Sequence, residues 1–203
     1  MPEPLLRQIR AVHDAHGLVV YQAYPADIAE AALTAGTFRP PFERDRMTWI
    51  KPSFRWMMYR SGWGTRAGQE RVLAVRISRA GFEWALAHAC PSHYDRDRYA
   101  DAAAWKADLG RSPVRLQWDP ERSTRLAPLA HRAIQIGLSG EAVHRYVDEW
   151  ILGVEDVTAL AHESRDLLRT SGPEAADARI PAERPYPLPE HLAERIGATR
   201  AGS

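Results

Sequence analysis

Residues 46–63, RMTWIKPSFRWMMYRSGW, concentrate the side chains of this chain that could recognise a flat, charged ligand. These eighteen residues hold three Trp, two further aromatic residues, three Arg and one Lys. Aromatic rings stack on nucleobases and cations neutralise phosphates, so the mixture favours binding of a nucleotide or a nucleic acid. The candidate phosphate contacts are Arg46, Lys51, Arg55 and Arg60.

Lys51 is one of only two lysines in a chain that holds 27 Lys and Arg residues. It precedes Pro52, a residue suited to the first turn of a helix. Its ammonium group and the free amides of that helix could therefore share one anion. Ser53 would add a hydroxyl group there, and Trp49 and Tyr59 are candidates for ring contacts.

The same segment also has a purely structural interpretation. Phe54, Met57 and Met58 follow the i, i+3, i+4 spacing of a buried helix face, and we expect them in the core. The cations would then form an ordinary solvated face. For Arg46, Lys51 and Arg60 both interpretations stay open at this point.

The sequence lacks the common catalytic and phosphate-binding motifs. It has no GxGxxG or GxxxxGK[ST] phosphate loop and no GxSxG elbow, which argues against a Rossmann, P-loop or α/β-hydrolase enzyme. The eight histidines lack the spacing of a ligand set, so we expect no metal. Cys90 and His88, two residues apart on an expected helix, would point about 200° apart. We therefore expect Cys90 to be a buried structural residue.

The composition is that of one globular domain, with 45% hydrophobic and 26% charged residues in 203. No apolar run approaches the ~18 residues of a membrane span, so we expect no membrane partner. The N-terminal residues carry acids and lack a long apolar run, which argues against a secretory signal. A single cysteine fits a reducing cytoplasm. The oligomeric state stays open.

The net charge of +1 hides a strong asymmetry along the chain. Residues 39–79 contain ten Arg or Lys and three Asp or Glu, whereas residues 141–183 contain four Arg and ten acids. One basic segment on a nearly neutral protein indicates a local anionic partner rather than a DNA-coating protein.

Hydrophobic periodicity predicts a single α+β domain over residues 1–170, with a mixed, mainly antiparallel sheet flanked by helices. Residues 171–203 form a Pro-rich C-terminal tail, either extended or packed across the surface. Expected strands are 17–24, 71–78, 114–118, 133–138 and 150–154. Expected helices are 27–36, 52–62, 80–89, 100–109, 141–150 and 157–169.

Several runs closely resemble the bacterial and fungal domain-of-unknown-function 4291 family. They are YQAY (21–24), the Trp-rich segment 46–63, GQERVLAVRI (68–77), GFEWALAH (81–88), VRLQWDPER (114–122) and IQIGLSGEAVHRYVDEWI (134–151). The resemblance covers most of residues 18–165. It implies relatives, without implying a reaction.

A second resemblance, one of layout, is to ADP-ribosyltransferase-like domains. It implies an NAD contact from Tyr21 or Gln22 on the first strand, and a helix that ends at Gly36 before Phe38. It also implies a late carboxylate, Glu141, that stabilises the ribosyl cation formed when NAD, the co-substrate, loses nicotinamide. An acid at a helix start, favoured by the helix dipole, is the simpler explanation of Glu141.

Two functions therefore follow as expectations. The first is an ADP-ribosyltransferase-like domain that binds NAD or a related nucleotide, with a nucleic acid as one option for the substrate it modifies. The alternative is a non-catalytic module that binds a nucleotide or nucleic acid through its basic, Trp-rich segment. Only the first needs the carboxylate of Glu141.

Overall fold

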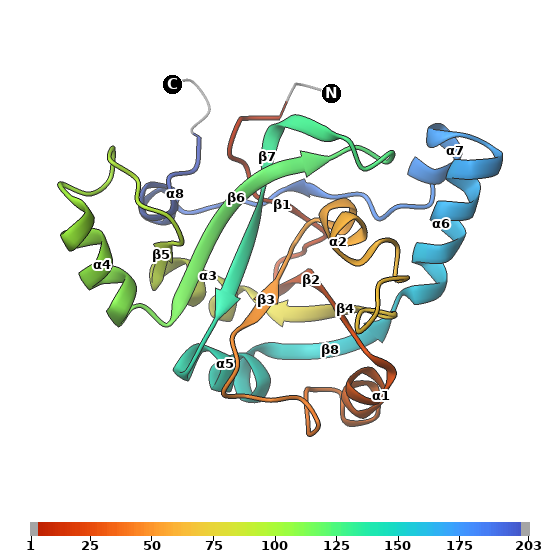
Figure 1. The fold of residues 1–203 in the computed structure, drawn as a ribbon, viewed down its shortest axis with the longest axis horizontal. Helices are drawn as coiled ribbons and strands as arrows, with labels where there is room; N and C mark the ends of the chain where they lie inside the picture. Colours follow the sequence, from red (N-terminus) through yellow and green to blue (C-terminus); the bar gives the residue numbers. More distant parts are fainter. Residues whose placement is uncertain (1–3, 200–203) are drawn as a thin grey trace.

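Two β-sheets and the helices around them build the domain, which the computed structural model describes for residues 4–199 (Figure 1). The larger sheet has the strand order β3-β7-β6-β5. Strands β6 and β7 pair antiparallel over most of their length, and β5 joins β6 in parallel. Its strands are β3 (Thr48–Ile50), β5 (Ala89–Pro91), β6 (Val114–Arg122) and β7 (Pro128–Leu138).

The smaller sheet is antiparallel throughout and has the order β2-β4-β8. Its strands are β2 (Gly17–Tyr24), β4 (Arg71–Ser78) and β8 (Ile151–Asp156). A backbone bridge between Tyr21 and Lys51 connects this sheet to the larger one just after β3. Strand β2 and the Trp-rich segment are thereby held side by side.

The core lies between the two sheets. Alternating residues of each strand point into it, as the period of two in their sequences predicts. Fully buried examples from both sheets are Leu18, Val20, Val75, Ile77, Val114, Ile136 and Leu138. A second cluster of buried residues gathers around Phe54, Met57 and Met58, which the helical spacing correctly assigned to the core.

Helices surround this core, with α4 near one end of the molecule and α6 and α7 near the other (Figure 1). After α5 the chain makes a π-helical turn, Tyr146–Trp150, before β8. The helices are α1 (Ala26–Ala35), α2 (Phe54–Ser61), α3 (Arg79–Ala87), α4 (Ala102–Arg111), α5 (Glu141–Arg145), α6 (Thr158–Thr170), α7 (Pro173–Asp177) and α8 (Glu190–Ile196). None of the helices in residues 4–199 is long and apolar enough to cross a lipid bilayer.

The predicted α+β class is confirmed, as is the mainly antiparallel pairing. Two details differ from expectation. The strand predicted to end at Trp118 continues through Asp119 and Pro120 to Arg122. Strand β5 covers β6 only as far as Leu116, so Pro120 lies where β6 is an edge strand, and proline is tolerated there. The short strands β3 and β5 carry too few residues for their period to be recognised.

The segment after residue 170 packs on the rest of the domain. Strand β9 (Arg184–Pro185) pairs with β1 (Arg10–Ala11) near the N-terminus. Beyond it, Tyr186, Leu192 and Ile196 are at most 5% exposed and belong to the main core. The Pro-rich composition allowed packing across the surface, but it indicated neither the helices α7 and α8 nor the burial of these side chains in the core.

Candidate functional site

A cavity of about 650 Å³ lies beside the Trp-rich segment. The ends of β2 and β3, the segment before β3, helix α2 and strand β7 enclose it. Its wall combines cations, indole rings and amides, a mixture that suits an anionic ligand with an aromatic part. These wall residues include Arg46, Lys51, Arg60, Trp49, Trp56, Gln22, Gln69 and Gln135.

Lys51 is the buried cation of this wall, with 6% of its surface exposed. Backbone hydrogen bonds to Tyr21 fix its position, and its Nζ lies 5.4 Å from the ring centroid of Trp56. Among residues 4–199, no carboxylate forms an ion pair with its ammonium group, which donates a hydrogen bond to the Trp49 carbonyl oxygen at 3.4 Å. Burial, helped by the nearby charge of Arg60, lowers the pKa of Lys51 to about 7. The cavity therefore holds a cation without a matching anion.

Trp49 forms part of the same wall because β7 has a glycine opposite it. A Cβ atom at Gly137 would lie 2.9 Å from Cζ2 of Trp49, closer than packing allows. The missing side chain therefore lets the indole ring lie against the sheet. Trp49 remains partly exposed and lines the cavity, so part of its indole ring can contact a ligand.

Gln135 contributes an amide from β7. Its Nε2 donates to Gln117 Oε1 at 2.5 Å and to Asp119 Oδ2 at 2.6 Å, which fixes the direction of the amide group. Burial raises the pKa of Asp119, whereas the charge of Lys51 opposes that rise. The carboxylate of Asp119 thus contacts the amide of Gln135 but is not among the residues that line the cavity.

Gln22 shapes the cavity through a closed hydrogen-bond network. Its Nε2 donates to the hydroxyl oxygens of Tyr24 and Thr48, and its Oε1 accepts from the Tyr146 hydroxyl at 2.6 Å. Both protons and the oxygen of the amide are therefore occupied. We infer that Gln22 holds the wall rigid and is poorly placed to exchange partners with a ligand.

The cavity unites half of the predicted site residues. Those that line it are Gln22, Arg46, Trp49, Lys51 and Arg60. On α2, Trp56 and Arg60 reach the cavity together because they are four residues apart. Arg46 is well exposed at the rim and makes only a 3.5 Å ion pair with Glu43.

The other predicted residues lie elsewhere. Tyr21 is buried against Phe54, and Ser53 caps α2 by accepting from Trp56 N. Arg55 pairs with Asp177 at 2.7 Å on the opposite side of α2, and Arg122 stacks on the exposed ring of Tyr59 at 3.6 Å. Glu141 is exposed, pairs with Arg145 at 2.7 Å and does not line the cavity.

Two acids meet at the start of α2. Glu183 Oε1 accepts from Phe54 N at 2.7 Å, and Glu121 Oε1 accepts from the Ser53 hydroxyl at 2.9 Å. Burial, together with the neighbouring carboxylate of Glu121, raises the pKa of Glu183 to about 8. The C-terminal segment thus provides a helix cap that holds a proton near neutral pH.

We expect Glu183→Gln to remove part of the pH dependence of stability. An unfolded glutamate titrates near pH 4.3, so between about pH 5 and 8 unfolding releases a proton and the wild type loses stability as pH rises. Glutamine stays neutral and still offers an oxygen to Phe54 N. Urea denaturation should therefore show the variant more stable than the wild type at pH 8, by on the order of 2 kcal/mol.

Glu174→Gln, at an exposed acid of α7, is the matched control and should leave the slope unchanged. An unchanged slope in Glu183→Gln as well would mean that Glu183 is ionised in the folded protein at neutral pH.

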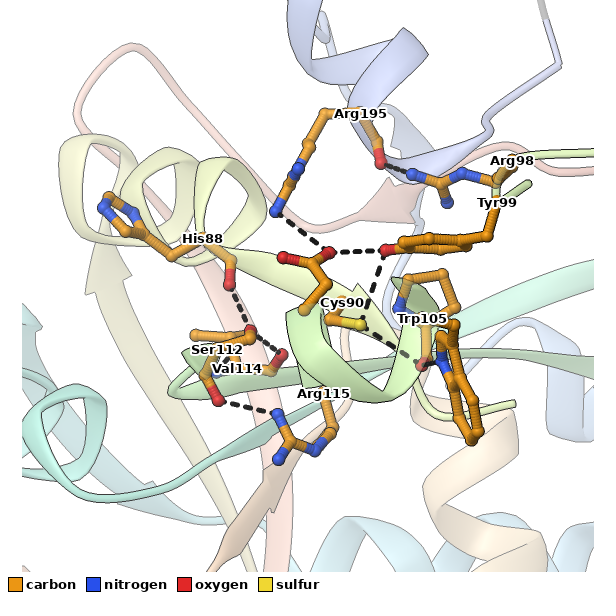
Figure 2. Close-up of polar contacts among 11 residues, drawn as sticks. His88, Cys90, Arg98, Tyr99, Trp105, Ser112, Val114, Arg115 and Arg195 are labelled. Carbon is orange, nitrogen blue, oxygen red and sulfur yellow. Dashed lines mark hydrogen bonds and ion pairs between the residues drawn. The ribbon is translucent and has the colours of Figure 1, made fainter. Parts of the chain in front are cut away.

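Cys90 belongs to a separate, structural cluster (Figure 2). Its sulfur lies 3.5 Å from the Tyr99 hydroxyl, which donates to Asp108, whereas the His88 ring points away and stacks on Trp84. Burial raises the pKa of the Cys90 thiol, which lowers its reactivity. The expected structural role of Cys90 fits this environment. Residues 4–199 contain no group of three or more His, Cys, Asp or Glu arranged to hold a metal ion.

Sequence reasoning missed Gln135 and Trp56 as wall residues. Trp56 shares α2 with core residues and was not among the candidate site residues; it is 7% exposed. Gln135 is the polar residue of the alternating run AIQIGL, so its side chain had to point away from the core. That signal was present, but it did not indicate what the outer face would meet.

The matching family model is Domain of unknown function (DUF4291), and it matches residues 8–186. The match includes every residue named above as lining the cavity and continues to Tyr186, beyond the end of the runs that suggested the family. No curated protein matches the chain. Since the match covers most of the 203 residues, the chain belongs to the DUF4291 family.

Proposed function

We propose that this protein is an ADP-ribosyltransferase-like domain that binds NAD or a related nucleotide in the cavity beside the Trp-rich segment. The observation that carries the proposal is the buried ammonium group of Lys51, which has no anionic partner among the described residues and shares its cavity with Arg60 and Trp49. A phosphate supplies the missing anion, and a base or nicotinamide ring supplies a stacking partner for the indole.

Size and charge support the same ligand class. About 650 Å³ falls within the range of small-molecule sites, which is roughly 300–1,000 Å³. Arginine binds phosphate with paired N–H groups and stays protonated, so Arg46 and Arg60 would hold a pyrophosphate at any physiological pH. A chain with a single cysteine forms no internal disulfide and fits a reducing compartment, so the proposal includes a cytoplasmic location.

The transferase half of the proposal needs a carboxylate near the ribose. Glu141 was the candidate from the layout of the chain, but it does not line the cavity, whereas Glu43 does. We expect nicotinamide release from NAD to depend on one of these acids. Comparison of Glu141→Gln with Glu43→Gln identifies which one, because loss of a catalytic carboxylate should abolish turnover and preserve binding.

The alternative, a module that only binds nucleic acid, gains support from the Tyr59 ring that lies exposed with Arg122 on it. Such a surface resembles a stacking platform for single strands. Its binding would depend on many phosphate contacts and would fall steeply with salt.

Calorimetric titration tests these possibilities together. NAD, ADP-ribose, single-stranded RNA and single-stranded DNA are titrated at low and moderate salt. We expect saturable NAD binding that survives moderate salt and weakens at least tenfold in Arg60→Gln. Arg66→Gln, at an exposed arginine outside the cavity, should bind like the wild type. Binding of nucleic acid alone, with a steep salt dependence, would overturn the nucleotide proposal in favour of the binding module.

A further inference from the structure

Lys51 differs in chemistry from the arginines beside it. A guanidinium group stays protonated in proteins, whereas a buried amine can lose its proton and become a nucleophile. Lys51 lines an open cavity, and its Nζ lies over the ring of Trp56, another lining residue, so an electrophile bound there could reach it. Arg46 and Arg60 would hold the ligand's phosphates in either state of Lys51, so Lys51 can act as an ammonium group toward an anion and, once deprotonated, as an amine toward an electrophile.

We propose that Lys51 forms an imine with the carbonyl carbon of a phosphorylated aldehyde bound in the cavity, such as the open-chain ribose end of ADP-ribose. The proposal rests on the proposed function, because the cavity's cations must first hold the ligand's phosphates. It adds to that function a substrate class, a nucleotide with a free aldehyde, and a covalent role for one residue.

The chemical step is balanced without another reactant. The lone pair of neutral Nζ attacks the carbonyl carbon, a C–N bond forms, and the carbonyl oxygen takes up a proton. The resulting hydroxyl group then leaves as water, while the nitrogen loses its protons to solvent and to that water. Amine and aldehyde give imine and water, and no oxidation occurs.

The surroundings of Lys51 favour the neutral amine. The ring of Trp56 and the peptide groups of β2 and β3 exclude water from it. Arg60 on α2 adds like charge and Asp119 on β6 opposes it without forming an ion pair, whereas Arg46 and Glu43 at the rim pair with each other at 3.5 Å. Lysines desolvated next to another cation are activated as nucleophiles by these same two effects.

The chain offers an internal control, because Lys51 and Lys106 are its only lysines and Lys106 is exposed on α4. Pyridoxal 5′-phosphate, which is an aromatic, phosphorylated aldehyde, serves as the probe, and borohydride reduction traps its imine. Peptide mass spectrometry then measures labelling at each lysine and at the α-amino group. At pH 7 we expect Lys51 to be labelled at least tenfold faster than Lys106, and ADP-ribose to compete.

Two variants separate a nucleophile from a mere cation. Lys51→Arg keeps the charge and should lose the trapped adduct. Arg60→Met removes like charge and should move the midpoint of Lys51 labelling to higher pH. Equal labelling of both lysines in the wild type, or a midpoint unmoved in Arg60→Met, would overturn the proposal.

Calorimetry keeps this proposal distinct from the proposed function. Saturable binding of NAD and ADP-ribose without any trapped adduct would refute the nucleophile and leave the nucleotide site standing. Absence of both binding and adduct would refute both proposals.

Discussion

Replacement of Lys51 by methionine should stabilise the protein and at the same time weaken its binding of nucleotide. Methionine is apolar, has a similar length, and would join a wall that already contains Met47 and Met57. The change removes the ammonium group of a residue that is 6% exposed, and this group has no ion-pair partner among residues 4–199. Function and stability are therefore expected to change in opposite directions.

The pH dependence of this gain follows from the pKa of about 7 for Lys51 in the folded protein, against an ordinary value near 10.5. Below pH 7 both states are protonated and the full cost of burial is present. Between pH 7 and 10.5 only the unfolded state keeps its proton, so the wild type recovers stability as pH rises. Lys51→Met should thus exceed the wild type by on the order of 3 kcal/mol at pH 6, and by much less at pH 10.

The binding half of the prediction comes from the lost anion contact. A hydrogen bond to a charged group contributes about 1.5–3 kcal/mol, so affinity for ADP-ribose should fall roughly ten- to a hundredfold. Urea denaturation at pH 6 and pH 10, with calorimetry at pH 7, measures both effects in one variant. Lys106→Met is the matched control and should change neither.

Either half can fail separately. A variant less stable than the wild type at pH 6 would show that Lys51 stabilises the fold through contacts of its own. Unchanged affinity for ADP-ribose would place the nucleotide site outside this cavity.

The sequence predicted what is local and failed where distant segments meet. The i, i+3, i+4 spacing assigned Phe54, Met57 and Met58 to the core, because periodicity alone decides which face of a short helix is apolar. The same rotation explains the scatter of the candidate cations. Arg55 and Arg60 are five residues apart on α2, so they point to different sides, and only Arg60 reaches the cavity.

The cavity itself required tertiary structure. Gln135 reaches Lys51's neighbourhood because β7 lies next to β3 in the sheet, a pairing of residues more than 80 positions apart. The lowered pKa of Lys51 likewise results from burial, and the residues next to it in the sequence do not indicate that it is buried. Lysine is rare in this Arg-rich chain, which made Lys51 a candidate, but only the fold shows that the residue is buried beside the cavity.

The C-terminal segment gives the second large expected effect, namely that a chain ending at Thr170 should not fold. Residues after this point include Tyr186, Leu192 and Ile196 of the main core and Ile180 of the cluster around α2. Each buried side chain of this kind contributes about 1.5–3 kcal/mol. Four of them together approach the whole stability of a typical domain, roughly 5–15 kcal/mol.

Polar contacts across the same boundary add to this loss. Truncation removes the Glu183 cap of Phe54 N and the Ile196 carbonyl that accepts from Trp118 Nε1 at 2.9 Å. Circular dichroism and the dispersion of amide NMR signals should show the 1–170 chain without cooperative unfolding. A chain ending at Thr199 keeps every contact described here and serves as the control.

The outcome decides where the domain ends. Cooperative unfolding of the 1–170 chain would support a boundary at residue 170 and make the following residues an accessory segment. The DUF4291 match, which continues to Tyr186, favours the opposite result. Tyr186→Ala in the full chain supplies a graded version of the test, with an expected loss of about 3 kcal/mol for a large aromatic side chain. A large loss of stability in both the truncated chain and Tyr186→Ala would show that the fold depends on the residues after Thr170. These residues include Glu183, which caps α2, the helix that carries Arg60 and Trp56.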